Sequence, residues 1–197
     1  MKKLLLLIFS FSLLFSYDAA HLKKFKATKV CEDCDLTNAD LSNSNYESAN
    51  LSGSDLSNAN LSNSNFAKSN FWGVKLENAI ATNSNFFQSN FETTVLTNAN
   101  FDGSIFKGAK LQLSELSNTS FKEANLWAAK FNEAVINNTI FDGARIAEAR
   151  FVDVDLTTAS FNDVLAYKAY FESSTLLSSQ CKYLEKEEVI LKNCECE

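Results

Sequence analysis

The 197-residue sequence is poor in the residues on which most catalytic and metal sites depend. It contains one histidine (His21), one methionine, no proline and 5 glycines. A single histidine near the N-terminus excludes histidine metal clusters and leaves no imidazole to activate a nucleophile in the body of the chain. No glycine-rich phosphate loop, carboxylate pair or group of metal ligands stands out either. The sequence therefore predicts a non-catalytic protein without a cofactor or metal.

Positive charge is also scarce. The formal net charge is −6, which disfavours nucleic acid as a partner because phosphate binding depends on clustered lysine and arginine. Hydrophobic residues make up 46% of the chain and charged residues 21%, so a folded rather than a disordered chain is expected. The 17 phenylalanines are unusual and require a place in that fold.

Residues 1–16 have the features of a targeting segment. Lys2 and Lys3 precede a predominantly apolar run from Leu4 to Phe15. This run is shorter than the roughly 20 residues that span a bilayer, but it fits the hydrophobic region of a secretory signal peptide. We therefore expect a bacterial signal peptide cleaved after Ser16. The remaining chain would have a net charge of −8, no stable membrane anchor, and a periplasmic or secreted location. Cleavage after Ala20 is the alternative, which Asp18 three residues before that site disfavours.

A five-residue repeat dominates the rest of the chain. Within residues 34–181 a large apolar residue such as Leu36 recurs at nearly every fifth position, and twelve of the 17 phenylalanines occupy this core position. Two residues before it the side chain is small, and the residue directly before it is often Asp or Asn. All 5 glycines and nine asparagines lie two residues after it, and these residue types tolerate positive φ. Each unit is therefore expected to be a short extended segment followed by a corner.

Units such as Ala39-Asp40-Leu41-Ser42-Asn43 and Ala59-Asn60-Leu61-Ser62-Asn63 resemble the A(D/N)LXX consensus of the pentapeptide-repeat family. The resemblance covers about three quarters of the chain in one register. It implies an all-β solenoid, namely a right-handed quadrilateral β-helix in which four repeats, or twenty residues, complete one coil. Residues 34–181 would then form about seven coils and, at ~4.8 Å per coil, a rod of roughly 35 Å.

Both ends of such a rod are expected to be covered by short α-helical caps, because an open β-helix exposes unpaired backbone. Residues 17–33 are predicted to contain a helix from Asp18 to Phe25, with Asp18 as N-cap, followed by a CxxC motif. Residues 182–197 are predicted to contain a second helix, from Tyr183 to Lys192, and a cysteine-containing tail.

Five residues inside the repeat depart from its size pattern, one of which is Val164, a valine at the small position that is expected to restore side-chain volume beside Ala166. Alanine replaces the large core residue at Ala81 and Ala166, whereas valine enlarges the small position at Val74 and Val154. Because cores respond to changes of side-chain volume, we expect local widening or twist of the coil there and no functional role.

The five cysteines favour disulfides in an exported protein. Cys31 and Cys34 are expected to bond to each other at the first corner. Cys181 is expected to bind the tail through either Cys194 or Cys196, and the remaining cysteine is either free or links two chains in a homodimer. A zinc site that joins both groups is excluded by their separation along the rod. A thiol–disulfide role of the CxxC motif is a weaker alternative, because the motif follows the expected helix instead of preceding one.

The twenty-residue coil predicts one partner-binding face. Outward residues forty positions apart lie on the same face at every second coil, and exposed apolar patches with aromatic anchors are typical of binding surfaces. The candidate partner-binding residues are Phe87, Ile105, Trp127, Leu165 and Tyr167. An adjacent face is predicted to carry a basic ladder of Lys110, Lys130 and Arg150.

The preferred prediction is a non-catalytic exported scaffold that binds a protein or another envelope component. The family resemblance implies an alternative, since some members are acidic rods that resemble duplex DNA and protect DNA gyrase by occupying its binding groove. Residues 34–181 carry 16 acidic and 9 basic residues, a net charge of −7, which is compatible with that role. The expected export, the basic ladder and the uninterrupted repeat disfavour it.

Overall fold

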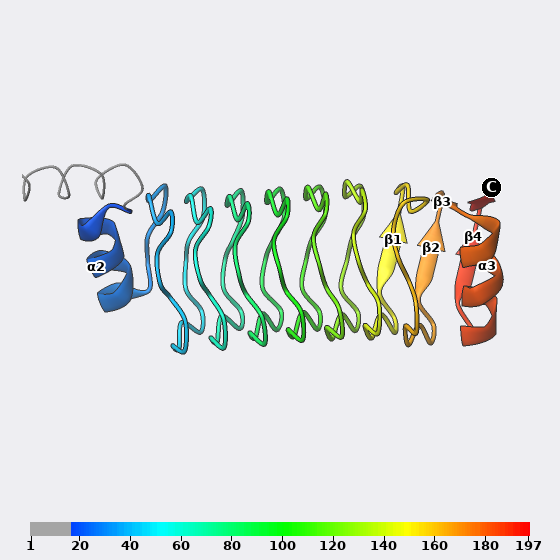
Figure 1. Ribbon diagram of the computed structural model, residues 1–197, viewed down its shortest axis with the longest axis horizontal. Coiled ribbons are helices and arrows are strands. Elements are labelled where there is room, and N and C mark those ends of the chain that lie inside the picture. The colour runs from blue at the N-terminus through cyan, green and yellow to red at the C-terminus, as the bar shows by residue number, and fades with distance from the viewer. Residues whose placement is uncertain (1–16) are drawn as a thin grey trace, which may run out of the picture.

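The computed structural model describes residues 17–197, which form a rod of stacked coils with a helix at each end (Figure 1). Helix α2 (Ala19–Thr28) lies at the N-terminal end, whereas helix α3 (Ser178–Leu184) and the 3-10 helix η2 (Glu185–Glu187) lie at the other. The expected signal peptide lies outside the described residues. No helix within residues 17–197 is both long and apolar enough to cross a membrane. The named strands are β1 (Arg150–Val152), β2 (Tyr170–Glu172), β3 (Thr175–Leu176), β4 (Ile190–Lys192) and β5 (Glu195–Cys196).

Each coil is twenty residues long because its backbone pairs, in parallel, with the residue twenty positions further on. Val30 bridges to Asn50 and Asp35 bridges to Asp55, and the same offset continues along the rod. Strands β1–β2–β4 and β3–β5 keep this register. Each five-residue unit contributes only one bridging residue before the chain turns. Most coils therefore contain isolated bridges, and formal strands occur only near the C-terminus.

The backbone amides of one unit show why the repeat has its composition. In residues 55–59, the amides of Asp55, Leu56 and Asn58 donate to carbonyl oxygens of the neighbouring coils at 2.8–2.9 Å. The Ala59 amide donates to the Leu56 carbonyl across the corner at 3.0 Å. The Ser57 amide donates instead to Asp55 Oδ1 at 2.9 Å. The Asp or Asn that precedes each core residue thus satisfies the one amide of the unit that forms no backbone hydrogen bond.

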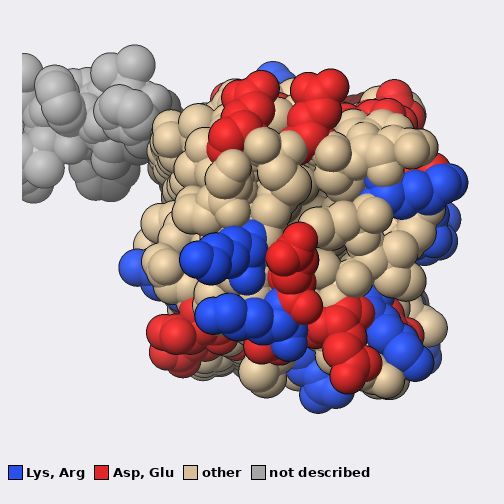
Figure 2. Space-filling view, turned by 90° about the vertical axis from the view of Figure 1, so that its right-hand side faces the viewer, with Lys and Arg blue, Asp and Glu red and all other residues tan. Residues whose placement is uncertain are grey.

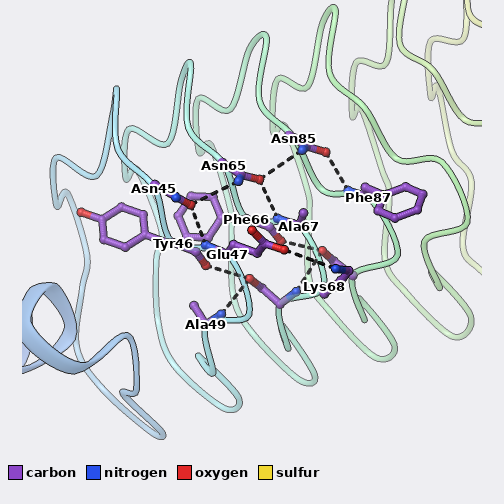
Figure 3. A network of polar contacts seen from close by, with 12 residues as sticks. Asn45, Tyr46, Glu47, Ala49, Asn65, Phe66, Ala67, Lys68, Asn85 and Phe87 are labelled. Atoms are coloured by element: carbon purple, nitrogen blue, oxygen red, sulfur yellow. Dashed lines mark hydrogen bonds and ion pairs between the residues drawn. The ribbon is translucent and has the colours of Figure 1, made fainter.

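Asparagine at this position also links neighbouring coils, as Figure 3 shows. Asn65 Nδ2 donates to Asn45 Oδ1 at 3.1 Å, and Asn85 Nδ2 donates to Asn65 Oδ1 at the same distance. The Asn85 Oδ1 atom accepts a further bond from the Phe87 amide at 3.0 Å. These side chains form a hydrogen-bonded ladder on the outside of the rod.

The core consists of the predicted large residues, with phenylalanine rings stacked along the rod axis. Ring centroids lie 5.4 Å apart between Phe101 and Phe121 and 5.7 Å apart between Phe121 and Phe141. Stacked aromatic pairs of this kind contribute about 0.5–1.5 kcal/mol beyond area burial. At the N-terminal end Phe25 of α2 packs on Tyr46, with centroids 4.8 Å apart, so the helix is attached to the core by an aromatic contact.

The N-terminal helix begins where the sequence places its N-cap and is longer than predicted. Asp18 Oδ1 accepts hydrogen bonds from the Ala20 amide at 2.8 Å and the His21 amide at 3.3 Å. The helix continues past Phe25 to Thr28, and Lys29 ends it in the left-handed conformation at φ 59°. Phe25 is the only buried residue of the helix, and no large apolar residue after it marks the last turn. The apolar pattern of the sequence therefore could not predict that the helix continues to Thr28.

The predicted C-terminal helix is wrong in position. Instead of running from Tyr183 to Lys192, α3 occupies Ser178–Leu184, so the expected boundary after Cys181 falls inside it. After η2 the chain returns to the solenoid, where Leu191 in β4 pairs with Phe171 in β2. The tail keeps the five-residue phase of the coils, and pairing with the preceding coil prevails over the helical spacing of its apolar residues.

All but one of the corners from Asp33 to Ser173 have positive φ. At Gly53, with φ 70°, a Cβ atom would lie 2.1 Å from Asp33 Oδ1, so a side chain at this corner would force Asp33 to move. The exception is Thr158. Threonine is β-branched and disfavours the left-handed region, although Thr93 adopts it with φ 60°.

The wall of the rod is interrupted beside Thr158. From the Val30–Asn50 bridge to the Asp155–Thr175 bridge, Val135 and Asp155 form the one twenty-residue pair that is not bridged. In this described part of the chain the amides of Ile136 and Asp155 form no backbone hydrogen bond between coils. The Asn138 amide donates to Thr158 Oγ1 at 3.0 Å where other corners use a carbonyl. A surface hollow of about 460 Å³ opens at this point.

The interruption corrects the predictions made from side-chain size. Val154 lines the hollow, so the widening predicted for it occurs. At Val74, Ala81 and Ala166 the backbone pairing with the preceding coil is unbroken. The hydrogen bonds between coils there show no widening, contrary to the prediction. Valine at the small position is therefore not sufficient to open the wall, which points to the corner conformation of Thr158 as the cause.

We predict that Thr158→Asn closes the interruption. Asparagine adopts positive φ readily, so the normal corner and its hydrogen bonds to the preceding coil should form. Amide exchange at Ile136 should slow, and the free energy of unfolding should rise by roughly 1 kcal/mol, the net contribution of one hydrogen bond. Hydrogen–deuterium exchange and thermal unfolding measure the two effects.

The matched control is Thr97→Asn, the same substitution at an outward position that is not a corner. It should change neither the exchange of Ile136 nor the stability by more than a few tenths of a kcal/mol. Unchanged exchange at Ile136 in Thr158→Asn would show that the corner does not cause the interruption.

Candidate functional site

The five predicted partner-binding residues lie on one side of the rod, here called the aromatic face. They are Phe87, Ile105, Trp127, Leu165 and Tyr167, and the structure places them in two adjacent columns. In one column Asn85, Ile105 and Asn125 bridge successive coils, and Arg145 bridges to Leu165. In the other, the Gly108 amide donates to the Trp127 carbonyl and the Glu148 amide donates to the Tyr167 carbonyl. The twenty-residue offset thus brings residues that are distant in the sequence onto one surface.

The apolar side chains of the aromatic face are most accessible toward the C-terminal end. Leu165 is 61% exposed, Tyr167 49% and Ile105 41%. Phe87 and Trp127 are half-buried. The surface that a partner can reach is therefore centred nearer to Leu165 and Tyr167 than to Phe87.

Trp127 lies between two cations. Lys107 Nζ lies 3.7 Å from the centroid of its ring, and Arg145 Cζ lies 5.4 Å from the same centroid. Each contact is a cation–π interaction of about 0.5–1 kcal/mol at an exposed site. The contacts hold the ring in one position and leave positive charge around it.

Tyr167 has a similar neighbour in Lys168, whose Nζ lies 4.9 Å from the ring centroid. A hydrogen bond with the Tyr167 side chain and the negative charges of Glu148 and Glu188 raise the pKa of Lys168. The lysine is therefore cationic at neutral pH. The aromatic face combines exposed apolar groups with local positive charge on a protein of negative net charge.

Sequence reasoning missed Arg145 and Lys168 as members of this face. The stacking rule alone places Arg145 one coil after Asn125, but it gives no reason for the arginine to turn toward Trp127. The exposed side chains of Trp72 and Leu113 were also missed, although their phase is outward. They lie on the adjacent face with the basic ladder and not on the aromatic face.

The basic ladder is present but partly neutralised. Lys110 bridges to Lys130, and Lys130 bridges to Arg150, on consecutive coils. Lys110 Nζ lies 3.8 Å from Glu92 Oε1, and Arg150 Cζ lies 4.4 Å from the centroid of the Tyr170 ring. Two of the three cations therefore have partners within the rod.

The cysteines form two disulfides, Cys31–Cys34 and Cys181–Cys196, and Cys194 is not bonded. The structure thus selects Cys196 from the two tail cysteines that the sequence left open. Cys31 and Cys34 are 0% and 3% exposed. Thiol–disulfide exchange requires that a sulfur be accessible to an attacking thiolate, so this burial disfavours a redox role for the CxxC motif.

We predict that loss of the Cys181–Cys196 disulfide destabilises the C-terminal coil. The bridge closes a loop with a sequence separation of 15, for which the chain-entropy relation gives about 3 kcal/mol. Cys196→Ser should lower the thermal midpoint and increase amide exchange in β4 and β5. Thermal unfolding and hydrogen exchange without reductant measure both.

Cys194→Ser is the matched control, because Cys194 is half-buried in the same tail and forms no disulfide. It should have little effect, and the unchanged chain should react with one equivalent of maleimide after unfolding without reductant. Three reactive thiols, or equal destabilisation by the two serine variants, would contradict the pairing.

Within residues 17–197 no group of three or more His, Cys, Asp or Glu side chains is arranged to hold a metal ion. The side chains that stand out are the aromatic face and the charges around it. Such an arrangement can bind another macromolecule through apolar contact and electrostatic attraction, and it offers no reacting group.

Comparisons with known proteins agree with the architecture. A family model described as pentapeptide repeats matches residues 34–73 and 47–83, with 8 copies, and a model described as a pentapeptide repeat region matches residues 84–161. No curated protein matches the chain.

Several solved structures are similar. QnrB1, a plasmid-mediated fluoroquinolone resistance protein, is 14% identical in a trypsin-treated form, with 85% of this chain and 88% of that chain covered and a TM-score of 0.60. HetL, a pentapeptide repeat protein involved in heterocyst differentiation regulation from the cyanobacterium Nostoc sp. strain PCC 7120, is 19% identical over 91% of this chain and 95% of its own, with a TM-score of 0.36. The protein alr5209 from Nostoc PCC 7120 is 21% identical over 52% and 84%, with a TM-score of 0.47. At these identities the likeness to QnrB1 shows a shared fold alone.

Proposed function

The chain belongs to the pentapeptide-repeat family, and on this premise we propose that it is a non-catalytic, exported scaffold that binds another protein of the cell envelope. The observation that carries the proposal is the aromatic face, where Trp127 is held between two cations beside the exposed Leu165 and Tyr167. Aromatic anchors beside charged groups are typical of protein-binding surfaces.

The cysteines support export. Two disulfides, both with buried members, are expected in an oxidising compartment and are rare in a reducing cytoplasm. The sequence of residues 1–16 is consistent with delivery to such a compartment. The two arguments use different observations, because one depends on the cysteine geometry of the described residues and the other on the sequence of residues 1–16.

Caps at both ends and the right-handed quadrilateral coil implied by the family are part of the proposal. At the C-terminal end, Gln180 Nε2 donates to the carbonyl oxygens of Leu156 at 2.9 Å and Ala159 at 2.8 Å. These carbonyls lie on a coil that has no complete coil after it. Helix α3 thus supplies the hydrogen-bond donors that a further coil would otherwise provide. By occupying these carbonyl oxygens, the helix would protect the edge of the last coil from pairing with other chains.

Protection of DNA gyrase is the alternative. The net charge of −7 on residues 34–181 and the fold shared with QnrB1 are compatible with it. The cations of the aromatic face and the basic ladder interrupt the acidic surface, and export would separate the chain from gyrase. We therefore prefer the envelope scaffold.

We predict that the protein made in its native host begins at Tyr17 and is found in the periplasm or the medium. Cell fractionation followed by intact-mass measurement tests this, because removal of residues 1–16 gives a defined loss of mass. A cytoplasmic chain that retains residues 1–16 would contradict export, and inhibition or protection of gyrase supercoiling would then be the assay to perform.

We predict that a photoreactive amino acid at position 165 crosslinks to an envelope protein in intact cells. Leu165 is the most exposed apolar residue of the aromatic face, so the probe should not disturb the fold. Trp127→Ala in the same chain should reduce the crosslink by tenfold or more, because hot-spot aromatics contribute about 2 kcal/mol or more.

Position 113 provides the matched control, because Leu113 is 56% exposed and lies on the adjacent face. The same crosslinked protein from positions 165 and 113 would indicate random collision. Equal yield with and without Trp127 would show that the aromatic face is not the binding surface.

A further inference from the structure

The N-terminal end of the rod carries a concentration of positive charge that the aromatic face does not include. Four of the 18 lysines and arginines of the chain lie within residues 23–29. Lys23, Lys24 and Lys26 are exposed, and Lys29 is half-buried at the C-cap of α2. Helix α2 itself contains no acidic residue, and within residues 17–197 none of these lysines forms an ion pair. Acidic residues flank the helix without pairing with these lysines: Asp18 is its N-cap, Glu32 and Asp33 follow it, and Asp40 lies near enough to Lys26 for an electrostatic interaction.

The core contacts of α2 determine which side of the helix faces outward. Phe25 is buried against Tyr46, and Leu22 packs on the core beside it. Figure 1 shows that the helix lies across the end of the stack. By helical periodicity Lys23 and Lys24 lie on the side of α2 away from Leu22 and Phe25, and both are exposed. The residues between these lysines on the outer side are alanines. Because alanine side chains are short, the lysine ammonium groups can reach a flat surface without obstruction.

The rest of the rod has the opposite character. Residues 34–181 have a net charge of −7. On the sides Lys68, Lys75 and Lys110 each lie within 4 Å of a carboxylate oxygen. The C-terminal end, which faces the viewer in Figure 2, shows Lys or Arg and Asp or Glu side chains intermixed. The outer side of α2 is therefore a cationic end surface on an acidic rod.

This distribution favours an extended anionic plane over a small ligand. Near such a plane the α2 lysines are attracted and the acidic sides are repelled, so the rod would stand on its N-terminal end. At physiological ionic strength the Debye length is about 8 Å, less than the height of two coils at ~4.8 Å each. Most of the acidic residues would then lie beyond the reach of the plane. Lysines act as point charges without a fixed geometry, which suits phosphate headgroups better than a single defined anion.

The position of α2 in the chain also indicates a bilayer. Residues 1–16 have the sequence of a membrane-directed segment, and α2 begins three residues after it, at Ala19. Among the described residues, α2 is therefore the element next to the membrane-directed segment in the chain. Cleavage after Ser16 would add the α-amino group of Tyr17 to the same end, and this group is largely protonated at neutral pH. The argument from the position of α2 in the chain rests on the proposed export, whereas the argument from the charge distribution is independent of it.

We propose that the outer side of α2 binds the phosphate headgroups of an anionic bilayer through Lys23, Lys24 and Lys26, and holds the rod end-on at the membrane surface. Binding is reversible and electrostatic, with no segment inserted. The aromatic face, on the side of the rod, remains available to a partner.

Co-sedimentation with vesicles tests the proposal on the chain 17–197, which contains all the coils and both helices described above. The chain should bind vesicles rich in phosphatidylglycerol and not vesicles of phosphatidylcholine. Binding should be lost when the ionic strength rises from about 0.01 M to about 1 M, since the Debye length falls from about 30 Å to about 3 Å. Lys23→Gln, Lys24→Gln and Lys26→Gln together should weaken binding by roughly 100-fold, at about fivefold per lysine.

The matched control is the triple variant Lys110→Gln, Lys130→Gln and Arg150→Gln, which removes the same charge from a side of the rod. It should bind nearly as well as the unchanged chain. Thermal unfolding of both variants verifies that they fold. If the α2 variant fails to fold, the dependence of vesicle binding on salt and lipid, measured with the unchanged chain, still tests whether the protein binds an anionic bilayer.

Three results would overturn the proposal: no binding to anionic vesicles, equal weakening by both triple variants, or binding to duplex DNA with the same dependence on the α2 lysines. The proposed export fails separately, because it is tested by fractionation and intact mass in cells. Vesicle binding by a chain found in the cytoplasm would refute export and leave the lipid-binding surface intact.

Discussion

The structure depends on one backbone constraint, a left-handed corner at every fifth residue. Each corner changes the direction of the chain after only one bridging residue, and four corners complete one coil. Each residue therefore lies beside the residue twenty positions further on. Glycine and asparagine adopt this conformation at little cost, which accounts for their phase in the sequence. Beside Thr158, where the corner is not left-handed, the Val135–Asp155 pair is the one that is not bridged, whereas Ile140 and Ser160 of the same coils remain bridged. The interruption is thus local and coincides with the one exceptional corner.

A consequence of this constraint is that surface properties occur as columns. Any outward residue lies directly over the residue twenty positions before it, so one substitution changes one step of a column and leaves the coil intact. The aromatic face illustrates this, because Lys107 and Trp127 are neighbours in space through their twenty-residue offset. A surface of this kind can vary in sequence while the core positions stay apolar. The fold therefore says little about what each face binds.

The five-residue pattern was sufficient to predict the core, because the inward positions follow from phase. The twenty-residue coil, and with it the face shared by Phe87, Trp127 and Tyr167, came from the resemblance to the pentapeptide-repeat family, and the bridges at a twenty-residue offset agree with it. It was not sufficient wherever the outcome depends on competition between two local patterns. Residues 183–192 have helical spacing and also the solenoid phase, and pairing with β2 decides in favour of a strand at Leu191. The contact of Arg145 with Trp127 depends on a rotamer, and the choice of Cys196 over Cys194 depends on the path of α3, so neither could be read from spacing.

The ends of the rod differ from its middle for a physical reason. In a repeat protein each unit is stabilised by its neighbours on both sides, so the first and last coils lack half of this stabilisation. Both disulfides lie at these ends: Cys31–Cys34 follows α2 at the start, and Cys181 of α3 is bonded to Cys196 of β5 at the end. Covalent bonds and helices thus replace missing neighbours where the repeat stops. Helix α2, unlike the C-terminal tail, does not pair with residues twenty positions on, so its cluster of lysines is not part of a column.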